Sequence, residues 1–530
     1  MLVASEGCFD ARCGVVTGYR CRVTDQHHVD ESRLPDVSDG TQHPDGGSAI
    51  MSEADSGWLQ RDTKPATDDA GAVLLAWRGT AGRTQTEVAT VLGTTQQHLS
   101  QLETGQRPIS LELRRKIITK LGIAPEDLGL SSGHARKLVS RDDASPEIAV
   151  SRLRWREERR WLNQHRAELG AVAVQLYPAE YRLPHTTVIA PAEWLPSEPV
   201  ELGSLALRLD EGPQTVGVDG SEPESAATRP LRTAGLRFER YTSAIKHVSP
   251  PALFWNGPVY RLLDVSSASR RLEFGLAAYF DRLDVSEALG HELAVVCLAE
   301  GLPSSPEQLR GRLPFRDLLG TPFDLHRRAV NPGIATLTIR LRRYPAEPTF
   351  LLHWRDPTKV AGGGGTYGVI PAGEFEPSSV ALWDRHNDFD LWRNIVREYA
   401  EELLGEPEHD GTRSRPIDYE HWPLFERLQA ARADGSVGVF FLGFNASALT
   451  LSTNILTVAV FDDDVFTDVF GSMVRFNEEG EIVAVGGGTP AEGIPFTETA
   501  VRRMLETEPM TASGAACLAL AWKHRDTLSL

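Results

Sequence analysis

The chain has 530 residues, 41% of them hydrophobic, and a formal net charge of −18 at pH 7. This length predicts roughly two to four domains, and the acidic balance excludes a protein whose whole surface binds nucleic acid, so that any DNA contact must come from a local basic face. No apolar run approaches the roughly 18 residues that a membrane span needs, and the first residues show no secretory signal.

The five cysteines predict a reducing compartment. Cys8, Cys13 and Cys21 lie near the start of the chain, whereas Cys297 and Cys517 are far apart in the sequence. A disulfide framework is expected in smaller chains with more closely grouped cysteines. We therefore expect a cytoplasmic protein.

Residues 1–66 are rich in Gly, Ser, Asp, His and Thr without hydrophobic periodicity, which predicts a disordered leader. Met51, which opens the segment MSEADSGW, is an alternative translation start. The cysteines and histidines of the leader lack the close spacing of a zinc-ligand pair such as Cys-x-x-Cys, so a zinc site is not predicted.

Residues 67–131 predict a compact helical domain. Thr84 and Glu87 have the spacing of a capping box, and Gly93 stands where a helix would end in a left-handed residue. Thr95 would cap the next helix. The inward faces of these two helices are expected to carry Val88, Ala89, Leu92, Leu99 and Leu102. A further helix is expected at 110–123 and a short one within 124–130.

The second helix of this pair has a polar outer face. Its expected outward residues are Gln96, Gln97, Ser100 and Gln101. A glutamine side chain can form two hydrogen bonds to the edge of an adenine, so these residues suit direct readout of bases. The helix carries no Lys or Arg, which predicts modest affinity for a single copy.

The stretch resembles the lambda-repressor/Cro-like (Xre-type) helix-turn-helix domain. The matching residues are Gln85, Ala89, Gly93, Leu99, Ser100, Leu102, Glu103, Gly105 and Arg107. The resemblance implies that the second helix enters the major groove, with Thr95, Gln96, Gln97, Ser100 and Gln101 at the bases. It also implies phosphate contacts from Gln85, Gln106 and Arg107. The alternative is a helical bundle that uses this fold for protein contact.

Residues 132–178 predict a basic helical connector. Ser145, Pro146 and Glu147 form a helix start, and the helix is expected to continue to about Tyr177. Its expected apolar stripe is Leu153, Trp161, Leu162, Leu169, Val172 and Leu176. Its arginines could lie over a DNA backbone or its stripe against a second subunit. A solvated helix between two domains is the alternative.

Residues 179–331 predict an α+β region of unknown role, with strands at PVYRLLDVS and RLEFGLAA followed by a helix. The pair His291-Glu292 does not indicate a zinc protease, because Val295 stands where the second histidine would be needed.

Residues 332–530 predict alternating strands and helices. Within the helix expected at 388–406, Glu398, Glu401 and Glu402 fall at i, i+3 and i+4 and so on one face. Clustered carboxylates can hold Mg²⁺ against a diphosphate. On the same helix, an apolar stripe of Leu391, Ile395, Tyr399 and Leu403 allows the alternative that the glutamates simply face water.

This helix resembles that of the Nudix hydrolases, whose Arg-Glu-x-x-Glu-Glu core is present from Arg397 to Glu402. Ile370 to Gly373 resembles the turn that precedes it. The chain departs from that pattern in three places: the interval from Gly373 to Arg397 is longer, Phe389 replaces a glutamate, and the closing glycine is displaced to Gly405. The resemblance implies a Nudix-like α/β/α sandwich over 332–530, with Glu398, Glu401 and Glu402 as Mg²⁺ ligands.

The sequence thus predicts a multidomain protein: an all-α helix-turn-helix domain, an α+β region and a Nudix-like sensor domain. We expect a DNA-binding transcriptional regulator that acts as a homodimer on double-stranded DNA. The Nudix resemblance implies a nucleotide-like ligand. The alternatives are a Mg²⁺-dependent nucleoside-diphosphate hydrolase with an accessory helix-turn-helix, and a non-catalytic partner-binding scaffold.

Overall fold

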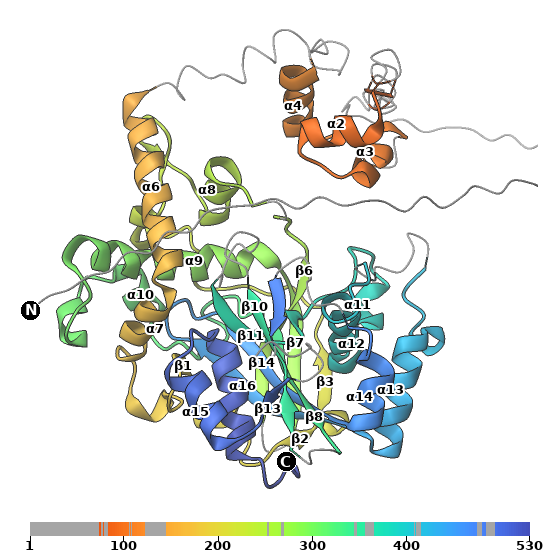
Figure 1. Ribbon diagram of the computed structural model, residues 1–530. Coiled ribbons are helices and arrows are strands. Elements are labelled where there is room, and N and C mark those ends of the chain that lie inside the picture. The colour runs from red at the N-terminus through yellow and green to blue at the C-terminus, as the bar shows by residue number, and fades with distance from the viewer. Residues whose placement is uncertain are drawn as a thin grey trace, which may run out of the picture. The chain divides into compact units, whose positions relative to one another are not determined.

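The computed structural model divides the chain into two compact units, Met1–Ile109 and Ser110–Leu530 (Figure 1). The structure describes residues 71, 74, 75, 78, 83–104, 107, 109–121, 145–251, 254–266, 270–343, 347–355, 365–407, 409, 415–473, 480–483 and 493–530. The predicted leader, the short helix expected within 124–130, and Arg136, Lys137 and Arg141 of the connector therefore lie outside the described residues.

In the first unit, α2 (Gln85–Leu92) and α3 (Gln96–Glu103) are joined by a tight turn. The backbone N–H of Thr84 donates to Glu87 Oε2 at 2.8 Å, and that of Glu87 donates to Thr84 Oγ1 at 3.3 Å, which confirms the capping box. Gly93 has φ +69°, where a side chain would strain the backbone. The predicted inward residues are all buried: Val88, Ala89, Leu92, Leu99 and Leu102.

The second unit opens with α4 (Leu111–Leu121), whose first turn is capped by Ser110 Oγ accepting from the Leu113 N–H at 3.2 Å. Ile117 of α4 is fully buried.

The predicted connector helix is two helices. A helix α6 (Pro146–Gln164) begins with proline at its first position as predicted, but it ends at His165, and α7 (Arg166–Val174) follows. The predicted apolar stripe was wrong at Leu153, which is 52% exposed. Trp155, two residues further along the helix, is buried instead and donates from its indole N–H to the Thr228 carbonyl at 2.9 Å. The contacts of α6 with distant segments set its inward face.

A small sheet and three helices follow. The sheet has the order β3-β7-β6, with β3 (Ala206–Leu209), β6 (Pro258–Ser266) and β7 (Arg271–Ala278). The same stretch of chain contains a hairpin and helices, β4 (Leu231–Thr233), β5 (Leu236–Arg237), α8 (Tyr241–Val248), α9 (Tyr279–Glu300) and α10 (Pro314–Leu319). Short 3₁₀ turns are η2 (Ala179–Tyr181), η3 (Ala192–Trp194), η4 (Leu202–Ser204), η5 (Pro223–Thr228), η6 (Pro306–Leu309) and η7 (Tyr419–His421).

The helix α9 packs on α6 and α8 around a buried polar group. His291 is fully buried, with Nδ1 2.9 Å from Tyr241 Oη and Nε2 3.1 Å from Glu158 Oε2. These bonds occupy both ring nitrogens, so His291 has a structural role.

The large sheet contains eight strands in the order β1-β13-β14-β8-β9-β16, with β12 pairing with β8 and β2 with β13. Its members are β1 (Val188–Ile189), β2 (Val200–Glu201), β8 (Gly333–Leu341), β9 (Thr349–Phe350), β12 (Ala372–Glu374), β13 (Val437–Ser447), β14 (Thr453–Asp462) and β16 (Ile494–Pro495). A second sheet is formed by β10 (Leu352–Arg355), β11 (Thr366–Val369) and β15 (Gly480–Val483). Because β1 and β2 join β13, the 179–331 and 332–530 regions share one sheet.

Helices cover both faces of the large sheet. Alternate residues of the parallel pair β8–β14 belong to two separate apolar clusters, as the period of two in a strand requires. One cluster includes residues of α12 (Leu391–Glu402), α13 (Pro423–Asp434) and α14 (Asp463–Phe470), and the other includes residues of α15 (Glu498–Glu506) and α16 (Ala512–Lys523). Figure 1 shows these two groups of helices on opposite sides of the strands. The short α11 (Asp384–Asn387) precedes α12. The region is therefore a mixed helix and sheet fold with a central sheet.

Candidate nucleic-acid interface

The helix α3 separates a packed face from a polar face. Leu99 and Leu102 are buried and Gln96 and Gln97 are exposed, as predicted, whereas Ser100 and Gln101 are half-buried. Thr95 caps the helix, its Oγ1 accepting from the His98 N–H at 3.1 Å. The first turn of α3 thus presents two amide side chains to solvent on a helix whose start is fixed.

The opposite end of α3 carries a buried carboxylate. Glu103 is 4% exposed and accepts from Arg78 at both oxygens, Nε to Oε1 at 2.5 Å and Nη2 to Oε2 at 3.0 Å. It also accepts from Gln85 Nε2 at 2.9 Å. The hydrogen bond to the Glu103 carboxylate raises the pKa of Arg78, so this guanidinium stays charged. Glu103 therefore fixes the position of Gln85, one of the residues expected at phosphate.

A second polar contact joins the turn to α3. Thr94 Oγ1 lies 2.6 Å from His98 Nδ1. Burial, and then the positive charge of Arg107, hold the pKa of His98 below its ordinary value. The imidazole is therefore neutral at neutral pH, and its contact with Thr94 holds the turn that precedes Gln96.

The remaining predicted residues follow α3. Arg107 is exposed, and its backbone N–H donates to the Gln101 carbonyl at 3.1 Å, so the chain turns back at the end of the helix. Gln106 lies outside the described residues. The structure thus brings Gln85, Thr95, Gln96, Gln97, Ser100, Gln101 and Arg107 onto one pair of helices and the turns beside them.

Sequence reasoning assigned no role to Arg78, His98 or Glu103. A signal for Glu103 was present, because it falls with Leu99 and Leu102 at i, i+3 and i+4 on the inward stripe, and an acidic residue there requires a buried partner. The identity of that partner depends on tertiary contact across residues 78–103, which no local pattern contains.

The second unit holds the other predicted site, on α12. Glu402 is buried and its Oε1 accepts from the Ala372 N–H at 3.1 Å, while Glu401 is exposed. The carboxyl of Glu398 lies against Gly373, where an added Cβ would be 2.2 Å from Glu398 Cδ. Among the described residues there is no group of three or more His, Cys, Asp or Glu placed to hold a metal ion. These three glutamates therefore do not form such a group among the described residues.

The comparisons with known proteins agree with the geometry of the first unit. A family model described as helix-turn-helix matches residues 74–128, about a tenth of the chain. No curated protein and no solved structure matches the chain. No helix among the described residues is long and apolar enough to cross a membrane. The matched segment with its outward polar helix supports a DNA-binding transcriptional regulator.

Proposed function

We propose that the protein is a sequence-specific transcriptional regulator whose α3 reads base edges in the major groove of double-stranded DNA. This proposal rests on the exposed amide groups of Gln96 and Gln97. The opposite face of the same helix is packed, because Leu99, Leu102 and Glu103 are buried. Thr95, Ser100 and Gln101 lie beside them and would contribute further contacts. A bidentate glutamine contact to adenine is the chemistry that suits such a surface.

Register on the DNA is set by phosphate contacts from Gln85, Arg107 and Gln106 in this proposal. Because α3 has no Lys or Arg, one copy supplies little electrostatic affinity. A homodimer on a two-fold operator would double the contacts, with half-sites roughly 34 Å apart.

A selection from random duplex DNA at low salt, using the full-length chain, tests this function. The expected product is a motif with two-fold symmetry and adenines at fixed positions. The absence of any enriched motif would instead favour use of the helical unit for protein contact.

We propose that the second unit senses a ligand or a partner protein. Its helix-covered sheet and the packing of Glu398 and Glu402 against β12 support a Nudix-like fold, in which a nucleotide-like molecule would be the ligand. We assign no metal chemistry to α12, because its glutamates belong to no group of described residues placed to hold a metal ion.

Thermal unfolding with a panel of nucleotides, with and without Mg²⁺, separates the alternatives. A sensor is stabilised by a nucleotide without turnover. Turnover that Glu401→Gln abolishes would favour the hydrolase, and this variant is preferred to Glu402→Gln because Glu402 holds the Ala372 N–H. A scaffold that binds only proteins would show neither effect.

A further inference from the structure

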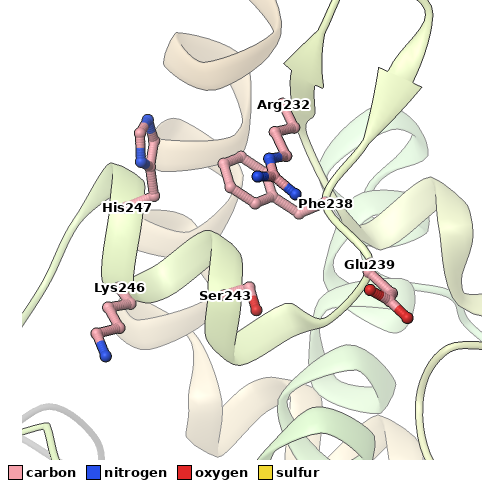
Figure 2. Close-up of a pocket in the computed structure, with 6 residues that line it drawn as sticks. All are labelled: Arg232, Phe238, Glu239, Ser243, Lys246 and His247. Carbon is pink, nitrogen blue, oxygen red and sulfur yellow. The ribbon is translucent and has the colours of Figure 1, made fainter. Parts of the chain in front are cut away.

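A surface hollow of about 410 Å³ lies in the second unit between the β4–β5 hairpin and α8. Figure 2 shows Arg232 extending from β4 toward the ring of Phe238, and Ser243, Lys246 and His247 along α8. Glu239 completes the lining. Of the six lining residues, Arg232 and Lys246 are basic, one is a histidine and one is a glutamate.

The walls of this hollow are held by α6. Arg152 donates to the carbonyls of Leu231 at 3.1 Å and Arg232 at 2.8 Å, and its guanidinium lies 5.8 Å from the centre of the Phe238 ring. The His247 ring lies 5.3 Å from the same ring. The backbone that carries Arg232 is therefore fixed to α6, and the face is a preformed surface.

The cations of this face differ from other basic residues of the unit. Arg154, Arg240 and Arg166 each form an ion pair with a carboxylate. Arg232 and Lys246 are exposed, and the described part of the chain places no carboxylate within ion-pair distance of either. A cationic face in a chain of net charge −18 is a local feature that the overall composition does not explain.

Helix α6 adds further exposed arginines beside this face. Arg156 and Arg160 are exposed and follow Arg152 at four-residue steps, so the three lie on one side of the helix. The attraction of basic residues to a helix C-terminus accounts for Lys246 and His247 at the end of α8. It does not account for Arg232, Arg156 and Arg160, which belong to other elements.

We propose that this face, defined by Arg156, Arg160, Arg232, Lys246 and His247, binds the phosphate backbone of DNA that flanks the site read by α3. This inference rests on the proposed function. Cations spread over a strand, a helix and a second helix fit a repeating polyanion better than one compact anion. Phe238 is 5% exposed, so its ring is not available for base stacking, and we assign the contact to phosphate.

The cationic face and α3 belong to one chain, and this covalent link favours flanking DNA as the ligand of that face. Residues 104–144 separate α3 from the start of α6, and a chain of that length spans at most on the order of 140 Å. Once α3 occupies its site, the cationic face is thus confined near the adjoining duplex. Tethering raises the effective concentration of the second contact without a new sequence requirement.

The test compares two duplexes and uses the full-length chain. One duplex contains only the selected motif, and the other adds about 20 bp of arbitrary sequence on each side, roughly 68 Å of helix. Affinity is measured over a salt series for the wild-type chain, for Arg232→Gln/Lys246→Gln, and for Arg502→Gln/Arg503→Gln. The last pair removes the same charge from exposed arginines on α15.

The expected result is that flanks tighten wild-type binding and steepen its salt dependence. Arg232→Gln/Lys246→Gln should flatten the slope of log K against log salt on the long duplex by about 1.8 for each bound copy, and so by about 3.6 for the proposed homodimer, because each phosphate contact contributes about 0.9. It should leave the motif duplex unchanged, and the α15 control should match the wild type on both.

Equal slopes for the wild type and Arg232→Gln/Lys246→Gln on the long duplex would overturn the inference, as would a wild type that gains nothing from the flanks. Stabilisation by inorganic pyrophosphate that this variant loses, with flanked-DNA binding unchanged, would also overturn it and assign the hollow to a small anion. Failure of the wild type to prefer the motif duplex over a scrambled one would instead refute the proposed function.

Discussion

The carboxylate of Glu103, at the end of α3, accepts a hydrogen bond from Gln85 Nε2, at the start of α2, at 2.9 Å. The two helices are therefore joined through a buried polar contact as well as through their apolar faces. Arg78 completes the contact by donating to both oxygens of the same carboxylate. The position of Gln85 relative to Gln96 and Gln97 thus depends on one acidic side chain that does not itself face solvent.

Replacement of Glu103 should loosen both helices. Glu103→Ala leaves the Arg78 guanidinium without its partner and frees Gln85, which should destabilise the pair by roughly 1–3 kcal/mol. Hydrogen exchange of the 85–103 backbone in the full-length chain is the measurement. Glu103→Gln, which keeps a neutral acceptor, should give an intermediate effect. Exchange rates in Glu103→Ala equal to those of the wild type would show that the contact is dispensable.

The helix-turn-helix unit should weaken in mild acid through His98. Its pKa is lowered by burial, so below the ordinary imidazole value the unfolded chain takes up a proton more readily than the folded chain. This contribution to stability is complete above about pH 6.5 and is lost as pH falls through the lowered pKa.

Hydrogen exchange of α3 between about pH 5 and 7.5, corrected for the intrinsic pH dependence of exchange, should show this loss in the wild type. His98→Gln, which cannot titrate, should remove it. Identical pH profiles for the two proteins would contradict the assignment.

A buried acid in the second unit predicts the opposite pH dependence. Glu292 accepts from the backbone N–H groups of Phe315 at 2.7 Å and Arg316 at 3.1 Å, at the start of α10, yet burial raises its pKa to about 7. The folded state therefore holds the proton more tightly than the unfolded state. The associated stability is complete below the ordinary glutamate pKa and is lost as pH rises through about 7.

The Glu292→Gln variant should lack this dependence. Relative to the wild type, its free energy of unfolding should rise between about pH 4.5 and 8 by roughly 2–4 kcal/mol. Thermal unfolding across that range is the measurement, with the exposed Glu300→Gln on the same helix as control. A constant difference between Glu292→Gln and the wild type would show that the carboxyl titrates normally.

Local signals in the sequence predicted the first unit well. The Thr84–Glu87 capping box, the left-handed Gly93 and the buried Leu99 each depend on residues within one turn or one helix, and all three are confirmed. On α12 the predicted stripe of Leu391, Ile395, Tyr399 and Leu403 is buried for the same reason.

Contacts between segments remote in the sequence could not be predicted from those local patterns. The break at His165 and the exposure of Leu153 follow from the packing of α6 on α9 and the β4–β5 hairpin, segments remote in sequence. The pairing of β1 and β2 with β13 joins residues more than two hundred positions apart. Glu401 and Glu402 have different environments: Glu401 is exposed, whereas Glu402 accepts a hydrogen bond from the Ala372 N–H. This difference depends on how α12 packs on β12.

The most direct test of base reading by α3 is the ratio of affinities for the selected duplex and a scrambled duplex of equal length. In Gln96→Ala/Gln97→Ala the binding free energy for the selected duplex should weaken by about 1–3 kcal/mol for each glutamine–adenine pair that the change removes, while the scrambled affinity stays unchanged. Thr86→Ala, an exposed change on α2, should keep the wild-type ratio. The ratio in the double variant should therefore fall by about 5- to 160-fold for each pair removed. A double variant that retains the wild-type ratio would contradict the assignment of α3 as the reading helix.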